Sequence, residues 1–245
     1  MLFCKCLAPS EFEVRMEAIK TLGNLGQAAL PVLIATLRDK NPRDSVQVRS
    51  ALTSMGPPAV RELIRLLHDP DPLLREHAIE ILGRMRPPVT EAVTTLAEAL
   101  HDPDQAVRSQ ALGSLGAIGP AAPKVTVPVL TQILWDLTRS NEFTAISSLA
   151  RIGSDAAPVL AQSLKHPAGA VRYVASDALV SVGPVAIPAV VEVLKDPDSG
   201  FQMLAEAILY RMGPTAVPEL RKLASEIPEL RPPIEKILRQ IQAGS

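Results

Sequence analysis

The side chains that could carry chemistry are few and scattered along this sequence. The only two cysteines, Cys4 and Cys6, lie one residue apart near its start. Two thiolates at that spacing can supply two ligands to a metal ion, but a structural zinc site needs four. The four histidines are His68, His77, His101 and His166. None of them completes a ligand set with the cysteines, so we expect no metal, no cofactor and no catalytic residues.

Catalytic motifs are equally absent. The sequence contains no Gly-rich phosphate loop, and no Ser-His-Asp or Cys-His set can be defended from its spacing. Carboxylate pairs recur throughout the chain in Asp-Pro-Asp segments and therefore indicate nothing specific. The sequence accordingly predicts a protein that is not an enzyme.

Composition narrows the classes of partner. The 245 residues are 47% hydrophobic and carry a net charge of −1, with only 3% aromatic residues. A nucleic-acid-binding protein usually has a basic excess and aromatic side chains for base stacking, so this class is disfavoured. No run of eighteen apolar residues is free of charge and proline, and the opening "MLFCKCLAPSEFEVR" is too interrupted for a signal-peptide core. With only two adjacent thiols, a reducing, cytoplasmic location is expected.

One sequence motif recurs seven times, and it predicts which helix and which face of that helix the other residues occupy. Its anchor, usually glycine, is separated from the next by 30 to 34 residues. The anchors are Gly26, Gly56, Arg86, Gly119, Gly153, Gly183 and Gly213. Leucine stands four residues before all seven anchors, and alanine stands eight before six of them. Offsets of this kind trace one apolar stripe of an α-helix that ends at the anchor.

The residues after each anchor predict a second helix. Glycine reaches a positive φ at little cost, so Gly183 can end the first helix. Pro188, like Pro31, Pro128, Pro158 and Pro218, then fits the first turn of the next helix, where its missing N–H does no harm. Most repeats end in an acidic or Asp-Pro junction, which is Asp-Pro-Asp in three of them, and the second aspartate of that segment can cap the following helix. A pair of helices cannot bury its apolar faces alone, so the repeats must stack into a solenoid.

The segment "DPDQAVRSQALGSLGAIGPAAP" at 102–123 resembles a HEAT-type repeat of the short kind found in phycobilin lyases and many bacterial scaffold proteins. The resemblance implies an all-α, right-handed solenoid of about seven helix-turn-helix repeats. We expect an N-terminal lead over 1–10, one solenoid domain over 11–227 and a capping segment over 228–245. Arg86 at an anchor, insertions in repeats three and four, and the irregular "TRSNEFTAISSLARIG" depart from the pattern.

Basic residues recur eleven positions before the anchors, at Arg15, Arg75, Arg108 and Arg172. They could form a basic binding track, or they could tie neighbouring repeats together while aspartates cap the helices. Asp71–Arg75 and Asp104–Arg108 also stand at the i,i+4 spacing of helical ion pairs. The resemblance favours the structural role.

The second helices of HEAT-type solenoids line the concave face, and this implies the candidate site. The candidate residues there are Arg38, Arg65, His68, Glu98, His101, Gln132, Trp135, Gln162, Lys165, Glu192 and Lys195. We expect His68, His101, Trp135, Lys165 and Lys195 to make the central contacts. The alternative for the cations is that the helix dipole favours them at helix C-termini. Trp135, the only tryptophan, either is exposed in the groove or packs over Pro123–Thr126 or Phe143.

These features favour a non-catalytic scaffold that binds a protein or peptide segment in the concave groove. One alternative, carried by the resemblance, is a phycobilin-lyase-like chaperone or enzyme subunit. Another is DNA binding, as in the HEAT-like alkylpurine DNA glycosylase, whose basic, aromatic-rich groove this chain lacks. The di-iron enzyme deoxyhypusine hydroxylase shares the fold but uses several His-Glu pairs, and here only the reversed Glu76-His77 occurs.

Overall fold

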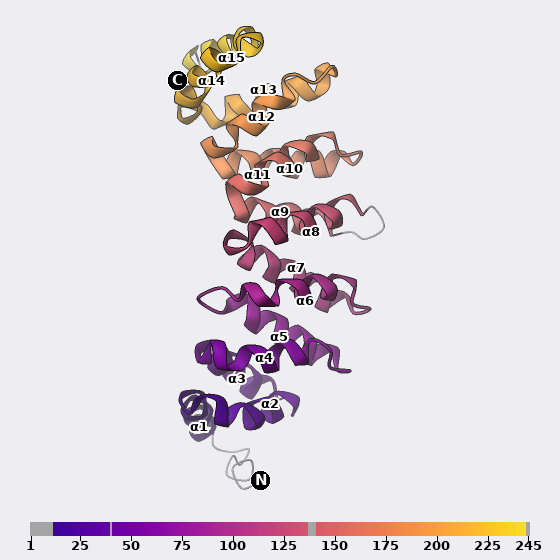
Figure 1. Cartoon of the computed structure of the whole chain (residues 1–245), viewed down its shortest axis with the longest axis vertical. Coiled ribbons are helices and arrows are strands. Elements are labelled where there is room, and N and C mark those ends of the chain that lie inside the picture. Colours follow the sequence, from indigo (N-terminus) through magenta and orange to yellow (C-terminus); the bar gives the residue numbers. More distant parts are fainter. Residues whose placement is uncertain (1–11, 40, 137–140, 244–245) are drawn as a thin grey trace. The chain divides into compact units, whose positions relative to one another are not determined.

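The computed structural model describes residues 12–39, 41–136 and 141–243, and every regular element in these ranges is helical. Cys4, Cys6 and the expected lead over 1–10 lie outside them. The chain divides into two compact units, Met1–Ala121 and Ala122–Ser245. In chain order, the helices form the seven expected pairs, α1–α2 to α13–α14, followed by α15 (Figure 1). The prediction of an all-α repeat fold is confirmed.

Unit 1, Met1–Ala121, contains seven α-helices in its described residues. They are α1 (Phe12–Asn24), α2 (Leu30–Arg38), α3 (Pro42–Met55), α4 (Pro57–Leu66), α5 (Pro72–Arg84), α6 (Val93–Glu98) and α7 (Gln105–Ile118). The first helices of the repeats, α1, α3, α5 and α7, pack against one another in order. We call these the A helices, and the intervening α2, α4 and α6 the B helices.

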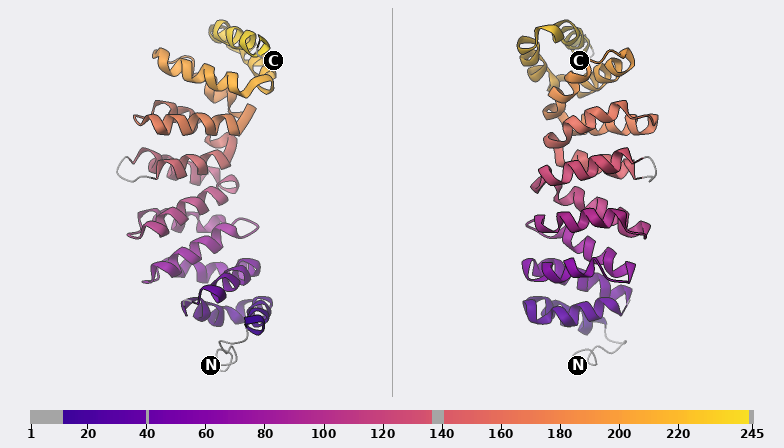
Figure 2. Two further views of the ribbon diagram at one scale, coloured as in Figure 1. Left: turned by 180° about the vertical axis from the view of Figure 1, so that it is seen from behind. Right: turned by 45° about the vertical axis from the view of Figure 1, so that its right-hand side comes forward.

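Unit 2, Ala122–Ser245, continues the same alternation. Its helices are α8 (Pro123–Trp135), α9 (Glu142–Ile152), α10 (Ala157–Gln162), α11 (Gly169–Val182), α12 (Ile187–Val193), α13 (Ser199–Met212), α14 (Val217–Glu226) and α15 (Arg231–Ala243). The A helices α9, α11, α13 and α15 form one layer, and the B helices α10, α12 and α14 pack beside one another in a second (Figure 2). The short B helices α10 and α12 are preceded by 3₁₀ turns at Gly153–Ala156 and Gly183–Ala186.

The core consists mainly of two leucine stripes, the predicted one before the anchors and a second one at or near the C-terminal ends of the second helices of the repeats. The leucines four residues before the anchors are all buried, at 7% exposure for Leu22 and 0% for the other six. The second stripe is buried equally well, from Leu37 at 0% to Leu67 at 6%. A fully buried leucine contributes about 1.5–3 kcal/mol relative to an exposed one. These two stripes therefore make a large contribution to the stability of the stacked repeats.

Five anchor glycines have the predicted positive φ: Gly26, Gly56, Gly153, Gly183 and Gly213. Gly183 has φ 80° and ψ −154°, and Gly213 has φ 63° and ψ −146°. Asparagine tolerates the left-handed helical region, but this combination of φ and ψ is essentially restricted to glycine. The anchor is therefore a backbone requirement of the sharp turn between the A and B helices.

Repeat four departs from two local predictions. Gly119 has φ −48° and continues the helical path into the 3₁₀ turn Gly119–Ala121, because the inserted residues carry the chain onward without a sharp turn. Pro128 was expected in the first turn of a helix, but α8 begins at Pro123 and contains Pro128 in its interior. The insertion therefore lengthens the helix at its N-terminal end, and the helix tolerates the loss of the N–H of Pro128.

The junctions between repeats are closed by side chains as predicted. Asp71, Asp104 and Asp198 each accept a backbone N–H of the helix that follows. The arginine four residues after the capping aspartate also contacts the junction. Nη1 of Arg75 donates to two backbone carbonyls of its junction, and Nη1 of Arg108 donates to two of its own. These contacts support the structural role of the arginines.

The stretch Gly169–Val193 is long and apolar enough to cross a membrane by length and composition. In the structure, 44% of its most apolar 18-residue segment is buried. It is not one straight helix, because Gly183 at φ 80° separates α11 from α12. Neither α11, with 14 residues, nor α12, with 7, reaches the roughly 20 residues that a span requires. Its buried side chains form part of the unit 2 core.

Candidate functional site

The structure places all eleven candidate residues on exposed positions of α8, of the B helices, or of the turns that end the B helices. The exposed residues are Arg38, Arg65, His68, Glu98, His101, Gln132, Trp135, Gln162, Lys165, Glu192 and Lys195. Sequence periodicity therefore assigned the solvent-facing register of these helices correctly. Which of these side chains lie together depends on contacts between repeats, and these differ in the two units.

In unit 1, Arg38 is engaged by the next repeat. Its Nη2 lies 2.5 Å from Oδ2 of Asp69, whose side chain is 6% exposed while that of Arg38 is 49% exposed. Arg65 pairs within its own helix with Glu62, at 2.9 Å. The guanidinium group of Arg38 is thus held by the buried carboxylate of Asp69, which limits the freedom of Arg38 to turn toward a partner.

The same relationship recurs in unit 2. Lys165 forms an ion pair with Asp196, and the hydrogen bond from Lys165 is the main reason that the pKa of Asp196 lies below its usual value. Lys195 contacts Glu192 at 2.9 Å and Glu229 at 3.6 Å. The pKa of Lys195 is raised, chiefly by its hydrogen bond to Glu192. Two of the expected central contacts, Lys165 and Lys195, therefore also connect successive parts of the chain.

Trp135 occupies the equivalent position and makes the equivalent contact with an aromatic partner. Its ring lies 5.0 Å from that of His166, at an interplanar angle of 45°. His166 is fully buried, while Trp135 remains 40% exposed. Neither of the two packing partners considered from the sequence, Pro123–Thr126 and Phe143, is this ring partner. Trp135 thus covers a junction and still presents part of its surface to solvent.

A groove of about 470 Å³ lies between α10 and α12, which pack side by side. Apolar residues of both helices and of the 3₁₀ turn before α12 line it: Ala157, Pro158, Ala161, Val185, Pro188, Ala189 and Val193. Ser154 and three candidate residues, Gln162, Lys165 and Glu192, complete the lining. The groove therefore combines an apolar surface with a few polar groups, which is the usual composition of a binding site.

Sequence reasoning found the polar lining of this groove and missed its apolar lining. Val185, which is 59% exposed, follows its anchor by two residues, and Ala189 follows it by six. The candidate residues all lie nine or twelve residues after the anchor, allowing for the insertions, and thus near the C-terminal ends of the second helices of the repeats. The repeated apolar residues near the N-terminal ends were available as a signal, but they resemble ordinary core positions in a sequence.

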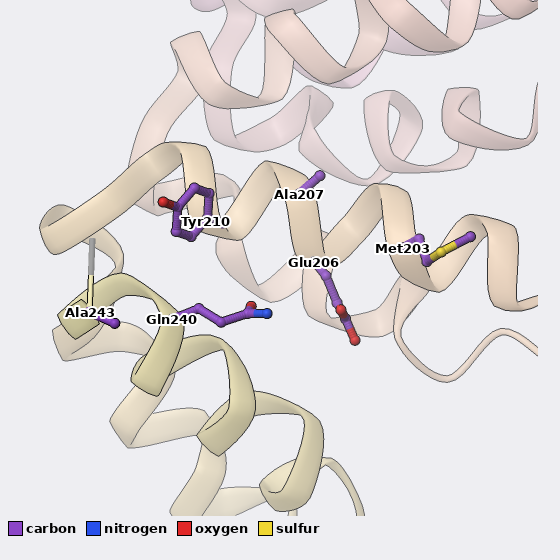
Figure 3. A pocket seen from close by; sticks show the side chains of 6 residues that line it. All are labelled: Met203, Glu206, Ala207, Tyr210, Gln240 and Ala243. Atoms are coloured by element: carbon purple, nitrogen blue, oxygen red, sulfur yellow. The ribbon is translucent and has the colours of Figure 1, made fainter. Parts of the chain in front are cut away.

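A second cavity of about 550 Å³ lies between α13 and α15 in unit 2. Met203, Glu206, Ala207 and Tyr210 of α13 face Gln240 and Ala243 of α15 across it (Figure 3). Met203 is 64% and Tyr210 48% exposed, and Glu206 is held by Lys236 at 2.7 Å. None of the candidate residues belongs to this cavity, which opens on the A-helix layer.

Within the described ranges, no three His, Cys, Asp or Glu side chains lie close enough together to hold a metal ion. Cys4 and Cys6 fall outside those ranges. His77 of the Glu76-His77 pair is buried in α5 at 6% exposure, and its Nδ1 has no hydrogen-bond partner. Burial, followed by the nearby charge of Arg49, holds the pKa of His77 below its usual value.

Comparison with solved structures confirms the fold. The chain is 25% identical to a chain of the CpcE–CpcF complex of phycocyanin lyase from Nostoc sp. PCC7120, with a TM-score of 0.52 over 62% of this chain and 98% of that one. It is 22% identical to YibA of Escherichia coli, with a TM-score of 0.51 over 88% and 80% of the two chains. Human deoxyhypusine hydroxylase, at 19% identity over 96% and 100%, reaches a TM-score of only 0.33.

Comparison with protein families is more specific. A search of curated proteins finds no match. The family model for PBS lyase HEAT-like repeats matches residues 14–39. The family model for HEAT repeats matches residues 60–141 and 127–209, which together make up more than half of the chain. With the helix pairs, the glycine turns and the two buried stripes described above, these matches show that the chain belongs to the HEAT-repeat family.

Proposed function

We propose that this protein is a non-catalytic scaffold that holds a segment of a partner protein in the groove between α10 and α12. The observation that carries the proposal is the groove itself, where apolar side chains of two adjacent B helices line a volume of about 470 Å³. A partner segment inserting an apolar side chain there would remove it and the lining from water. Burial of this kind contributes about 25 cal/mol per Å² of apolar surface.

The polar residues of the groove support recognition of a peptide. Gln162 can both donate and accept hydrogen bonds, as the backbone of a bound segment requires. Lys165 and Glu192 are already paired with Asp196 and Lys195. Because these ion pairs hold the side chains of Lys165 and Glu192 in place before binding, these side chains lose less conformational entropy when the complex forms.

Site-specific photo-crosslinking tests this proposal in the cells or lysate from which the protein derives. A benzoylphenylalanine is placed at Ala189, in the groove, and in a second protein at Val125 of α8. Val125 is 50% exposed and does not line the groove. We expect crosslinking at Ala189 to capture a defined partner that crosslinking at Val125 does not.

Two matched substitutions then test the contact itself. Val185→Glu puts a charge into the apolar lining of the groove, and Val125→Glu makes the same change at a similarly exposed valine. The Ala189 crosslink should disappear with Val185→Glu and persist with Val125→Glu. A partner captured equally from both crosslinking positions, or one unaffected by Val185→Glu, would contradict binding in this groove.

A second candidate function is a phycobilin-lyase-like role, as a chaperone or an enzyme subunit. It is favoured by the likeness to a chain of the phycocyanin lyase complex, which is almost fully covered at 25% identity. Mixing the protein with phycocyanobilin, alone and with a candidate partner subunit, tests it. A red-shifted absorbance would support a bilin-handling role, and unchanged spectra in both mixtures would count against it.

A further inference from the structure

A cavity of about 320 Å³ lies on the A-helix layer of unit 1, between α3 and α5. It is separate from the B helices that carry the proposed peptide groove. Three hydroxyl residues of α3, Ser50, Thr53 and Ser54, line it together with Arg49, Arg84 and Glu80, and the apolar Val46 and Ile81 complete the lining. Its composition differs from that of the α10–α12 groove, because most of the lining side chains are hydrogen-bond donors.

Two guanidinium groups converge on one carboxylate in this cavity. Nε of Arg49 lies 3.2 Å from Oε2 of Glu80, and Nη1 of Arg84 lies 2.9 Å from Oε1 of the same residue. One positive charge is therefore left over. Elsewhere on the A helices, in unit 2, Asp177 pairs with Arg211 and Glu206 pairs with Lys236, each one to one.

The pairing of Arg49 is also incomplete in its hydrogen bonding. Its Nε is buried, and despite the 3.2 Å approach to Glu80 it has no hydrogen-bond partner in the described residues. Such donors usually find an acceptor, since leaving one unsatisfied costs about 1–3 kcal/mol. Arg84, by contrast, has a side chain that is 70% exposed, so its remaining N–H groups are accessible to a ligand.

The hydroxyl groups add neutral donors beside the arginines. Thr53 uses its hydroxyl to donate to the carbonyl of Arg49, at 2.7 Å. Ser50 and Ser54 are exposed at the mouth of the cavity and also line the neighbouring groove between α1 and α3. Serine hydroxyls next to a guanidinium complement the several acceptor atoms of a carboxylate or phosphate.

The charge of Arg49 also acts on His77, a buried residue of α5. After burial, it is the main cause that lowers the pKa of His77, and it exceeds the opposing charges of Glu80 and of Asp71 taken singly. The pairing with Glu80 therefore does not cancel the effect of Arg49 on its surroundings.

We infer that the cavity between α3 and α5 is a binding site for a small molecule that bears a carboxylate or phosphate group. Arg84 and Arg49 attract and orient the oxyanion, and the hydroxyls of Ser50 and Ser54 donate to its remaining oxygens. The volume of about 320 Å³ lies at the small end of ligand sites. It suits a compound of a few carbon atoms better than a nucleotide.

Titration of the full-length ¹⁵N-labelled protein with inorganic phosphate and with succinate tests the site by NMR. The buffer should have an ionic strength of about 0.01 M, so that screening is weak. At least one anion should shift the amide signals of Ser50, Thr53 and Ser54 in a saturable manner. Sodium chloride at the same ionic strength should not reproduce these shifts.

Two substitutions in the cavity have opposite expected effects. Arg84→Gln removes a charged donor and should weaken binding about tenfold, as loss of one charge-assisted hydrogen bond does. Glu80→Gln removes the competing carboxylate and should tighten binding about fivefold, the effect of one unit charge at about 4 Å in a solvent-like dielectric. A purely structural role for these ion pairs would predict no such opposition.

Arg211→Gln is the matched control, because Arg211, like Arg84, is an A-helix arginine with an accessible side chain that is paired with one carboxylate. It should leave the dissociation constant unchanged. The inference is overturned if neither anion shifts the three amides up to about fivefold excess over a roughly 1 mM dissociation constant, a weak binding energy of about −4 kcal/mol. It is also overturned if Arg84→Gln and Glu80→Gln change affinity in the same direction.

Discussion

Trp135 lies against His166 with the ring centroids 5.0 Å apart, and His166 accepts the backbone N–H of Ala168 at Nδ1. At the corresponding junctions, Asp102 and Asp196 accept a backbone N–H two residues ahead in the same way. His166 therefore substitutes for an aspartate that closes the junction. Trp135 correspondingly substitutes for a cation such as Lys165, which meets Asp196.

Two substitutions at His166 should separate its two roles. His166→Ala loses both the acceptor and the ring contact, whereas His166→Asn keeps an acceptor for the N–H of Ala168. We expect the asparagine variant to be more stable than the alanine variant by about 1 kcal/mol, the value of one hydrogen bond. Urea unfolding followed by circular dichroism measures both, and equal stabilities would show that the Nδ1 contact contributes nothing.

Substitution of glycine by alanine should have opposite effects in a turn and inside a helix. Gly183→Ala should destabilise the protein by about 1–3 kcal/mol, because φ 80° with ψ −154° excludes a Cβ atom. Gly113→Ala lies inside α7 with nothing within 4 Å of a new Cβ, so it should stabilise by up to about 1 kcal/mol. Thermal unfolding of both variants checks this. A destabilised Gly113→Ala would show that α7 does not tolerate the methyl group.

The Arg75–Asp102 pair should be intolerant of lysine. Nε and Nη2 of Arg75 each lie 2.7 Å from an oxygen of Asp102, and Nη1 donates to the carbonyl of Asp69. Lysine cannot make this forked arrangement. Arg75→Lys should therefore cost about 1.5–3 kcal/mol in the free energy of unfolding, the range for hydrogen bonds to charged groups.

Arg231→Lys is the control for this measurement, because Arg231 pairs with Glu235 while its side chain is 68% exposed. It should change the free energy of unfolding by less than about 0.5 kcal/mol. The pKa of Asp102 supports the importance of the pair. Burial pushes that pKa upward, yet the hydrogen bonds from Arg75 and from the Asp104 backbone, with the charge of Arg75, hold it below its usual value.

The buried His77 should make stability depend on mild acid. Burial and then the charge of Arg49 lower the pKa of His77 in the folded state. The unfolded chain binds the proton more readily, so unfolding takes up protons as the pH falls through about 6.5, the ordinary value for histidine. Stability contributed by His77 is present above that pH and is lost as the pH falls toward the folded-state pKa.

The free energy of unfolding, measured between pH 7.5 and pH 5 for the wild type and for His77→Gln, tests this linkage. These limits bracket histidine's ordinary titration at about pH 6.5. Glutamine cannot titrate, so its curve should be flatter than that of the wild type over this window. Parallel curves would show that other groups carry the pH dependence.

Much of the fold was predictable because it rests on contacts within one repeat. The leucine stripes, the positive φ of Gly183 and Gly213, and the caps by Asp71, Asp104 and Asp198 all follow from residues a few positions apart. Helical periodicity and capping chemistry act at that range. The solvent-facing register of the eleven candidate residues was predictable for the same reason.

The chemistry of the surface was decided by neighbouring repeats. The spacing of Asp71 and Arg75 suggested a pair within one helix, but the Arg75 guanidinium reaches Asp102, 27 residues away. Trp135 and His166 likewise meet across a repeat. Such partners depend on how far one helix is displaced along the next, which is set by the packing of all the side chains between them.

The sequence alone determined the class of fold, the number of helix pairs and the faces that each helix buries. Only the tertiary structure decided that Gln162, Lys165 and Glu192 share a groove with Val185, and that Arg49 and Arg84 converge on Glu80. The physical reason is the range of the interactions: helix formation and burial repeat with a local period, whereas a cavity forms where two helices fail to fill the space between them.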